Sequence, residues 1–230
     1  MALVAVAIFT VPFVILLVLV KTSSPSLTNL DEGIALSLHA HALENPGYIA
    51  FLNVATEVFG PWTWRVLVVL TAFWLWRRGA PRLAVWAVAT ITFGGLLNLA
   101  LKGIVDRARP DLPDPVASAP GASFPSGHAM GAALGACILV LILLPFLRSM
   151  TSRIVVWVVA AAIMVFVAYS RVALGVHWTS DVIAGVALGV VVVVAAAVGF
   201  ETWRRGEGRE PAEPHVEGVE PEAFRGSHSG

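Results

Sequence analysis

Charged residues are scarce in this sequence of 230 amino acids: they make up 13% of it, where a soluble domain has about 25%. Hydrophobic residues make up 57% and the mean hydropathy is +0.81, so the chain has the composition of an integral membrane protein. The 15 basic residues balance the 15 acidic ones, which leaves no excess positive charge to attract a nucleic acid. The single cysteine, Cys137, lies in an apolar run, which excludes a disulfide within the chain and favours a packing role.

Long apolar runs are what the sequence has in place of charge. A transmembrane helix needs about 20 residues to cross a hydrocarbon layer of about 30 Å. Runs of roughly this length predict six spans, at residues 2–20, 58–76, 82–101, 129–147, 154–170 and 180–200. The first lacks a basic leading segment and a small-residue cleavage site, so we expect a retained anchor. The predicted fold class is all-α, a polytopic six-helix membrane bundle in which Arg65 interrupts the second span and must snorkel or face protein.

The stretch between the first two predicted spans, Lys21 to Glu57, is not apolar enough to cross a membrane. Apolar residues recur there at every fourth position, at Ile34, Leu38 and Ala42, shortly after two acidic residues. That spacing predicts an amphipathic helix lying on the outer surface of the membrane. The pair Asn45-Pro46 has the form of a helix cap followed by a first-turn proline, which predicts a second short helix.

The composition changes sharply near residue 206. Residues 206–230 are rich in Glu, Gly and Pro and contain almost no apolar side chains, which is typical of a disordered segment. We therefore expect one membrane domain at residues 1–205 and a disordered cytoplasmic tail at residues 206–230. The sequence contains no signal for an oligomeric state.

Lysine and arginine are unevenly distributed between the two ends of the predicted bundle. The segments after the second, fourth and sixth spans contain Arg77, Arg78, Arg82, Arg148, Arg153, Arg204, Arg205 and Arg209. By the positive-inside rule these segments face the cytoplasm, which predicts a multi-pass protein of the cytoplasmic membrane with both termini inside. The opposite, outer end holds Lys21 and four further basic residues: Lys102, Arg107, Arg109 and Arg171. They break the rule, and anion binding explains why they are there.

Lys102 and Arg109 bracket the end of the third predicted span, and Pro110 prevents the helix from continuing. Charged side chains at the edge of a membrane are unfavourable unless they have a function or reach water. These two residues therefore either anchor the helix at the interface, as the cytoplasmic arginines do, or bind an anion.

The motif Pro125-Ser126-Gly127-His128 stands directly before the fourth predicted span. Ser126 is a favourable N-cap residue, and Gly127 lets a ligand approach the backbone. A helix that starts there presents free amides and the positive end of its dipole, which together favour anion binding. His128 would then face the anion, although a capped helix with an incidental histidine has the same pattern.

His177 and Asp181 are four residues apart, so on a helix they share a face. The carboxylate can then accept the Nδ1 proton of the imidazole and leave Nε2 free as a nucleophile. Arg171 adds a planar guanidinium suited to bidentate contacts with phosphate. A metal site at His177 and Asp181 is the main alternative, but the cations Lys102, Arg109 and Arg171 would repel a divalent ion.

Three separated blocks can be compared with a known signature: Lys102-x6-Arg109-Pro110, Pro125-Ser126-Gly127-His128 and Ser170-Arg171-x5-His177-x3-Asp181. In order and spacing they resemble the signature of the type-2 phosphatidic acid phosphatase superfamily, with no signature residue missing. The signature covers residues 102–181, and the six-helix layout extends the similarity to about residue 200. The resemblance implies a membrane phosphatase for a lipid phosphate or lipid pyrophosphate, such as undecaprenyl pyrophosphate, phosphatidylglycerophosphate or phosphatidic acid.

The resemblance also implies a role for each signature residue. His177 is expected to attack phosphorus and form a phosphohistidine, Asp181 to activate His177, and His128 to protonate the leaving oxygen. The residues expected to hold the phosphoryl oxygens are Lys102, Arg109, Ser126, Gly127 and Arg171. Water then hydrolyses the intermediate, and neither a metal nor a cofactor is required. The alternatives are a lipid phosphotransferase with an alcohol acceptor and a non-catalytic lipid-phosphate transporter or binding protein.

Three features beside the signature have no implied role. Asp106 and Arg107 either line the mouth of the site or pair with each other, and pairing is favoured. The proline-rich loop from Asp111 to Pro120 is either a lid over the headgroup or a plain connector. Trp178, next to His177, is expected to be an interfacial anchor.

Overall fold

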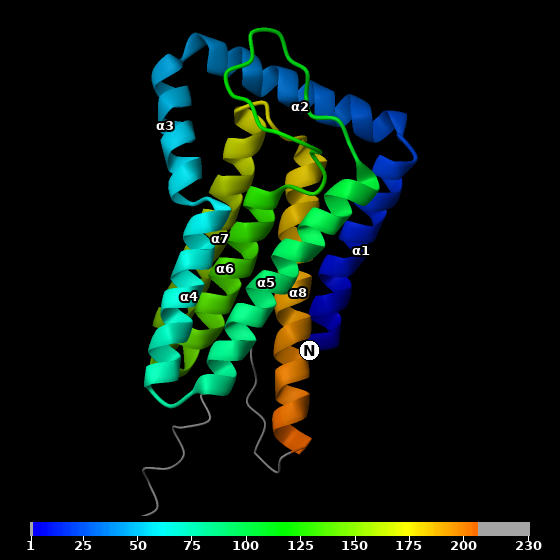
Figure 1. The fold of residues 1–230 in the computed structure, drawn as a ribbon. Helices are drawn as coiled ribbons and strands as arrows, with labels where there is room; N and C mark the ends of the chain where they lie inside the picture. Colours follow the sequence, from blue (N-terminus) through cyan, green and yellow to red (C-terminus); the bar gives the residue numbers. More distant parts are fainter. Residues whose placement is uncertain (1, 207–230) are drawn as a thin grey trace, which may run out of the picture.

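The structure is a computed structural model that describes residues 2–206, and every regular element among them is a helix (Figure 1). In chain order these are α1 (Ala2–Lys21), α2 (Pro25–Glu44), α3 (Pro46–Val58), α4 (Pro61–Arg77), α5 (Pro81–Val105), α6 (Gly127–Leu143), the 3₁₀ helix η1 (Leu144–Phe146), α7 (Met150–Ala173) and α8 (Thr179–Gly206). The predicted all-α class is confirmed. The predicted tail lies outside the described residues, except for Gly206, which ends α8.

Proline or serine marks the start of most helices. Helices α2, α3, α4 and α5 each begin with a proline, whose fixed φ suits the first turn and whose missing N–H is not needed there. Ser126 and Ser149 cap α6 and α7, because their side-chain oxygens accept hydrogen bonds from the amides of Ala129 and Ser152. These local signals explain why the helices begin close to the predicted starts of the spans.

Five helical stretches among residues 2–206 are long and apolar enough to cross a membrane: Pro46–Arg77, Pro81–Val105, Gly127–Phe146, Met150–Ala173 and Thr179–Arg204. A sixth candidate is a bent pair, in which α2 leaves α1 at an angle of 97°. Helix α1 itself runs beside α8 (Figure 1), so the predicted six-helix bundle is confirmed. The second span is longer than predicted because α3 continues α4 beyond a short break.

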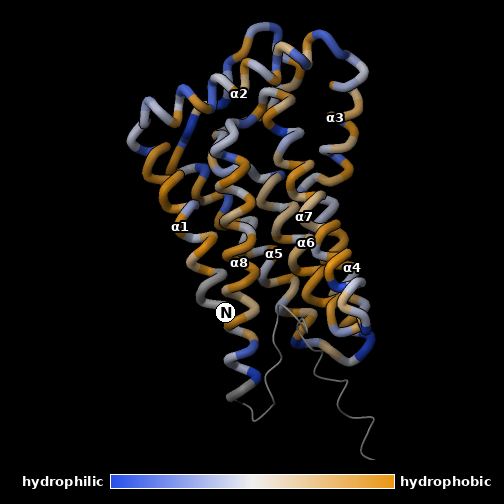
Figure 2. The backbone as a smooth tube through the Cα atoms, turned by 180° about the vertical axis from the view of Figure 1, so that it is seen from behind, coloured by the Kyte–Doolittle hydropathy of each residue, from blue (hydrophilic) through white to orange (hydrophobic). Residues whose placement is uncertain are grey.

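Large apolar side chains cover the outside of the bundle. Val14, Val69, Phe93 and Val158, on α1, α4, α5 and α7, are between 45% and 60% exposed. Such a surface is unfavourable in water and suits contact with lipid chains. Figure 2 shows hydrophobic residues along the length of the bundle and hydrophilic residues gathered at its two ends.

Helix α6 is the centre of the bundle: 72% of its apolar span is buried, against 17% for α7. Small residues let the neighbouring helices approach it closely. A Cβ at Gly185 of α8 would lie 2.7 Å from the carbonyl oxygen of Ser126, and one at Gly135 of α6 would lie 2.5 Å from Trp64 of α4. The start of α8 therefore lies against the start of α6, where the amide of Ser126 donates to the carbonyl oxygen of Asp181 at 3.0 Å.

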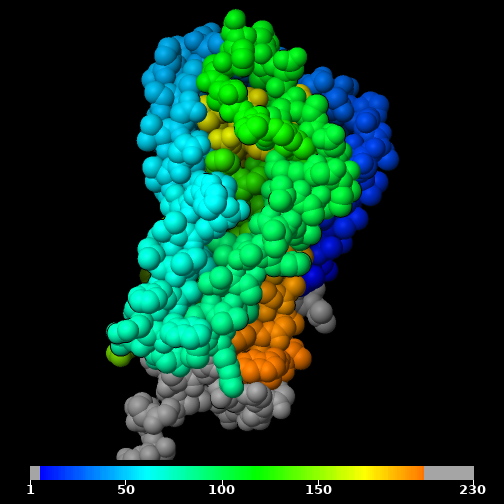
Figure 3. Space-filling view, viewed as in Figure 1, coloured from blue at the N-terminus to red at the C-terminus, as the bar shows by residue number. Residues whose placement is uncertain are grey.

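Helix α2 lies across one end of the bundle, as its amphipathic spacing predicted (Figure 1). Its buried residues are Asp31, Ala35, His39 and Ala42. The buried face is thus turned slightly from the predicted apolar row, because Ile34 and Leu38 are only partly buried. Nε2 of His39 donates to the carbonyl oxygen of Pro113 at 2.5 Å, which ties α2 to the loop between α5 and α6. Below this cover, the surface is hollowed between α4 and α5 (Figure 3).

Candidate active site

The three blocks of the predicted signature meet at the end of the bundle that α2 and α3 cover. They lie at the ends of α5, α6, α7 and α8 and in the segments that connect them. The predicted site residues found there are Lys102, Arg109, Ser126, Gly127, His128, Arg171, His177 and Asp181. Lys102, Arg109, Arg171 and His177 are all close enough to His128 to interact with it electrostatically, so both imidazoles belong to one cluster.

His177 and Asp181 are in contact, but they do not share a helix. Helix α7 ends at Ala173, and His177 lies in the turn that leads to α8, whose first turn contains Asp181. Gly175 allows this turn, because its φ of 68° is left-handed and favours glycine. Nδ1 of His177 lies 3.4 Å from Oδ2 of Asp181. The expected shared helical face was therefore wrong, although the pair of side chains forms.

Arg109 determines which nitrogen of His177 carries the proton. Nη1 of Arg109 lies 3.1 Å from Nε2 of His177, and a guanidinium can only donate hydrogen bonds. Nε2 is therefore the acceptor, and the neutral ring carries its proton on Nδ1, facing Asp181. Burial lowers the pKa of His177 to about 4, although the hydrogen bond to Asp181 opposes this shift. At neutral pH the ring is uncharged, with the lone pair of Nε2 on the side of Arg109.

Asp181 is held by a network that the sequence did not reveal. Its Oδ1 accepts from Nη1 of Arg107 at 2.7 Å, and its Oδ2 accepts from the amide of Trp178 at 2.9 Å. Arg107 also donates from Nη2 to Asp31 of α2 at 2.8 Å. The favoured pairing of Arg107 with Asp106 was therefore wrong. Asp106 instead ends α5 in a left-handed conformation, with a φ of 48°.

Ser180 and Trp178 extend this network around Asp31. The amide of Ser180 donates to Oδ1 of Asp31 at 2.9 Å, and the Ser180 hydroxyl donates to Oδ2. Nε1 of Trp178 donates to the carbonyl oxygen of Ala108 at 2.9 Å, and the guanidinium of Arg107 lies 5.5 Å from the centre of the Trp178 ring. Trp178 thus packs on the network instead of acting only as an interfacial anchor. The sequence signal that could have found Asp31 was its place three residues before Ile34, the first residue of the predicted apolar row.

The start of α6 supplies a possible anion site beside this pair. Oγ of Ser126 accepts from the amide of Ala129 at 3.5 Å, and the side chain is fully buried. No group in residues 2–206 accepts a hydrogen bond from the amides of Gly127 or His128. A Cβ at Gly127 would lie 3.3 Å from Oδ1 of Asn98, so the backbone is closely approached there. Free amides at a helix start favour an anion.

Carbonyl oxygens of the loop between α5 and α6 contact two of the predicted phosphate-binding cations. Arg109 donates from Nε to Gly121 at 2.9 Å and from Nη2 to Pro120 at 3.0 Å. Nζ of Lys102 donates to the carbonyl oxygen of Ala122. The end of the proline-rich loop therefore forms one wall of the site.

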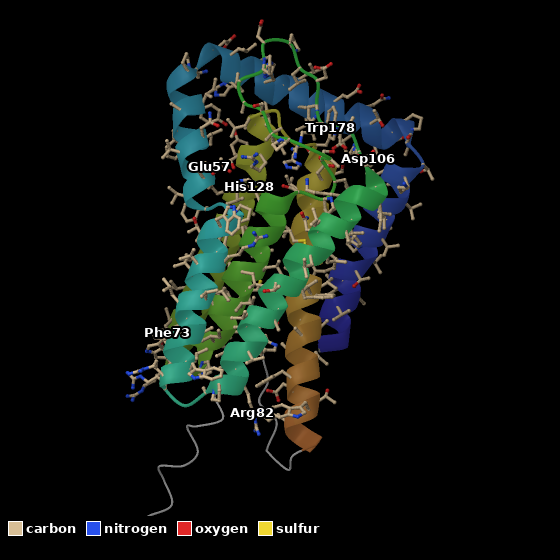
Figure 4. The ribbon with its side chains drawn as sticks, in the orientation of Figure 1. Glu57, Phe73, Arg82, Asp106, His128 and Trp178 are labelled. Atoms are coloured by element: carbon tan, nitrogen blue, oxygen red, sulfur yellow. The ribbon has the colours of Figure 1, made fainter. Side chains whose placement is uncertain are left out.

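Arg171 is only 6% exposed, and its Nε has no hydrogen-bond partner among the described residues. A buried guanidinium with an unused donor is unfavourable until an anion binds. The carboxylate that acts on Arg171 is that of Glu57, at the end of α3. Oε1 of Glu57 also lies 3.8 Å from Nε2 of His128 (Figure 4). Sequence reasoning assigned Glu57 no role, because nothing local links it to the signature.

The sequence model of one protein family, described as the PAP2 superfamily, matches residues 83–205, which is more than half of the chain. The chain belongs to the PAP2 superfamily. The match includes every predicted site residue, and it confirms the superfamily that the three-block signature indicated.

Two curated proteins are similar to parts of this PAP2 chain. Phosphatidylglycerophosphatase B of Bacillus subtilis is 41% identical over 99 residues, which are 42% of this chain and 47% of that protein. Undecaprenyl-diphosphatase of Sulfolobus acidocaldarius is 45% identical over 67 residues, 29% of this chain and 28% of that protein. The matches thus span about half the length of the first relative and about a quarter of the second.

A crystal structure is also similar to this chain; it is described as that of the first transmembrane PAP2-type phosphatidylglycerolphosphate phosphatase, from Bacillus subtilis. It superimposes with a TM-score of 0.73 at 26% identity and covers 86% of this chain and 96% of that one. The PAP2 fold therefore extends over nearly all of the chain, and a multi-pass membrane protein is supported.

Proposed function

We propose that this protein is a membrane phosphatase that removes the terminal phosphoryl group of a lipid phosphate or lipid diphosphate through a phosphohistidine. The observation that carries the proposal is the neutral ring of His177, with Nδ1 3.4 Å from Asp181 and Nε2 3.1 Å from Arg109. A phosphoryl group at Nε2 would lie among the clustered cations and near the start of α6. The names of two similar proteins, a phosphatidylglycerophosphatase and an undecaprenyl-diphosphatase, support a lipid substrate.

In the first step, Nε2 of His177 attacks phosphorus, so that a P–N bond forms and the bond to the leaving oxygen breaks. Asp181 stabilises the positive charge that the ring gains, through the proton on Nδ1. The leaving oxygen takes a proton from His128, a transfer worth about 10²- to 10⁴-fold in rate. Oε1 of Glu57 lies 3.8 Å from Nε2 of the His128 ring.

The phosphoryl oxygens carry more negative charge in the transition state, and donors fixed in place stabilise it. Lys102, Arg109 and Arg171 supply three cations, of which Arg171 has an unused Nε donor. Gly127 supplies a free backbone amide at the start of α6, and Ser126 a hydroxyl proton. An incoming phosphate competes with the loop carbonyls that Lys102 and Arg109 contact.

In the second step, water attacks the phosphorus of the phosphohistidine. His128, neutral after the first step, takes the proton from water, the P–N bond breaks, and inorganic phosphate leaves. The clustered cations do the electrostatic work that metal ions do at other phosphoryl-transfer sites. We therefore propose a reaction that needs neither a metal nor a cofactor.

The site is proposed to open at the outer face of the cytoplasmic membrane. The arginine-rich segments lie at the other end of the bundle, where Figure 4 shows Arg82 far from His128. The positive-inside rule directs that end to the cytoplasm, and both termini with it. A lipid phosphate would keep its hydrocarbon chain in the bilayer while its headgroup reaches the cluster.

Phosphate release from a panel of lipid phosphates and diphosphates tests the proposal, with the full-length protein in detergent and EDTA present. Inorganic phosphate should appear without an added alcohol, and His177→Ala should abolish its release. Product that forms only when an alcohol acceptor is present would indicate a phosphotransferase. Binding without turnover would indicate a transporter or binding protein, and a strict need for Mg²⁺ would contradict the metal-free mechanism.

A further inference from the structure

A cavity of about 230 Å³, lined by both polar and apolar groups, lies between α4, α5 and α6. Its lining includes Arg65 of α4, Gly95 and Asn98 of α5, and Gly127 of α6. It corresponds to the hollow between α4 and α5 in Figure 3. Gly127 belongs to the proposed phosphate site, so the cavity begins at that site and extends along the membrane-spanning part of the bundle.

Arg65 is the charged residue of this cavity. It is partly buried, and its guanidinium lies 4.8 Å from the centre of the Trp62 ring. Its Nη2 would be 3.1 Å from a Cβ at Gly95, so the absence of a side chain there makes room for the guanidinium. No carboxylate among residues 2–206 lies within salt-bridge distance of Arg65. A cation in a membrane span without a counter-charge indicates a function.

One face of α5 connects Arg65 with the proposed phosphate site. Gly95, Asn98 and Lys102 are spaced by three and four residues, so they lie along the same face of the helix. Nδ2 of Asn98 donates to the carbonyl oxygen of Pro125 at 3.3 Å, and its Oδ1 lies beside Gly127. Polar groups thus continue from Lys102, past Asn98, to the guanidinium beside Gly95. Arg65 is on the hydrocarbon side of the phosphate site, where the leaving group of a lipid substrate must lie.

We propose that Arg65 binds a second phosphate group of the lipid substrate, located between the phosphoryl group that is transferred and the hydrocarbon chain. The inference rests on the proposed function and deepens it, because it selects lipids with two phosphates over lipids with one. Two chemistries place a second phosphate there. In a lipid diphosphate the two phosphorus atoms share an oxygen, and in a phosphatidylglycerophosphate a glycerol separates them.

Replacement of Arg65 is expected to change the substrate preference of the protein and not the phosphoryl-transfer step itself. A charge-assisted hydrogen bond in a partly buried site is worth about 10- to 100-fold in kcat/KM. Loss of Arg65 should therefore lower the preference for two-phosphate over one-phosphate substrates by that factor. A purely structural role of Arg65 would lower turnover of both classes equally and leave the preference unchanged.

The test compares kcat/KM for two substrate pairs, farnesyl diphosphate with farnesyl phosphate and phosphatidylglycerophosphate with phosphatidic acid. The full-length wild type, Arg65→Gln and Arg65→Lys are measured in detergent. Arg78→Gln is the matched control, because Arg78 is at the opposite end of α4 and lies 5.6 Å from the centre of the Trp74 ring. Arg65→Gln should lower the preference by about 10- to 100-fold, Arg65→Lys by less, and Arg78→Gln should leave it as in the wild type.

A change confined to the farnesyl pair supports the inference and identifies a diphosphate, and one confined to the glycerol pair identifies the glycerol-spaced phosphodiester. If the wild type hydrolyses these substrates and Arg65→Gln keeps the same preference in both pairs, the inference is wrong while the proposed function stands. If the wild type releases phosphate from none of the four, the proposed function and the inference both fail.

Discussion

Arg107 and Asp181 are joined by a hydrogen bond of 2.7 Å, although they lie 74 positions apart in the chain. The other terminal nitrogen of Arg107 reaches Asp31 at 2.8 Å, and both carboxylates are almost completely buried. One guanidinium therefore connects the helix that covers the site with the carboxylate behind His177. Since two buried negative charges share it, Arg107 supports the position of Asp181 and, through it, the orientation of the His177 ring.

Replacement of Arg107 should impair both folding and turnover. Arg107→Gln leaves two buried carboxylates without their cation, and we expect kcat to fall by about 10- to 100-fold together with a lower melting temperature in detergent. Asp31→Asn should lower kcat and the melting temperature less, because Arg107 can still form its hydrogen bond to Asp181. The double variant should lose less than the sum of the single variants, since both changes disrupt one network. Wild-type kcat in Arg107→Gln would show that Asp181 needs no such support.

The close contact between α6 and α8 should depend on Gly185. A Cβ there would meet the carbonyl oxygen of Ser126 at 2.7 Å, and a backbone atom cannot move aside easily. Gly185→Ala should therefore destabilise the fold by about 1–3 kcal/mol and lower activity, as measured by thermal melting and phosphate release. Gly199→Ala, on the same helix with nothing within 4 Å of its Cβ, is the control and should melt at or above the wild-type temperature. Equal melting temperatures for the two variants would exclude this packing constraint.

The helices could be predicted because their signals are local. The apolar runs indicated the spans, and the prolines at positions 46, 61 and 81 and the cap at Ser126 mark the starts that the structure shows. The residues of the candidate site could be predicted for two reasons. Charged residues at the edges of apolar runs are unfavourable unless they have a function or reach water, and the spacing of these residues resembles a family signature.

Contacts made only by tertiary folding could not be predicted in this way. Arg107 and Asp31 are separated by 76 positions, and no periodicity relates them. The predicted pairing of Arg107 with its neighbour Asp106 relied on sequence proximity alone. It was wrong because the two carboxylates that bind the Arg107 guanidinium, those of Asp31 and Asp181, come from distant parts of the chain. Nothing in the sequence indicated a role for Glu57 either, because no local pattern relates it to the signature. Only the packing of α3 against α7 brings Glu57 to Arg171 and His128.

His128 should matter most for substrates with poor leaving groups. If it protonates the leaving oxygen, His128→Ala should lower kcat by about 10²- to 10⁴-fold for a lipid phosphate, whose alkoxide needs a proton. The loss should be much smaller for p-nitrophenyl phosphate, whose leaving group departs as an anion. His177→Ala should abolish hydrolysis of both, because the nucleophile is then absent. An equal loss on both substrates in His128→Ala would contradict a role as general acid.

The pH profile should report the neutral state of His177. Burial lowers its pKa to about 4, below the ordinary value of about 6.5, although Asp181 opposes the shift and the charges of Arg109 and Arg171 add to it. The ring is then unprotonated down to about pH 4. If it is the nucleophile, as proposed, the acid limb of kcat/KM should lie well below 6.5 once substrate ionisation near 6 is corrected for. A limb near 6.5 would indicate an ordinary, solvated histidine.

The same shift affects stability. Between about pH 4 and 6.5 the unfolded chain binds the proton that folded His177 does not, so the folded state should lose stability as the pH falls through this window. Thermal melting of the wild type and of His177→Ala across this range measures it, and the wild type should show the steeper decline. Parallel curves would mean that His177 titrates alike in both states.

The proposed attack of His177 on phosphorus is tested most directly by rapid quenching with a lipid phosphate labelled in its terminal phosphoryl group. The label should appear on the protein within one turnover, in a bond that is stable to base and labile to acid, and peptide mapping should locate it at His177. Label on His128 or another residue, or complete release of labelled phosphate by His177→Ala, would contradict the mechanism.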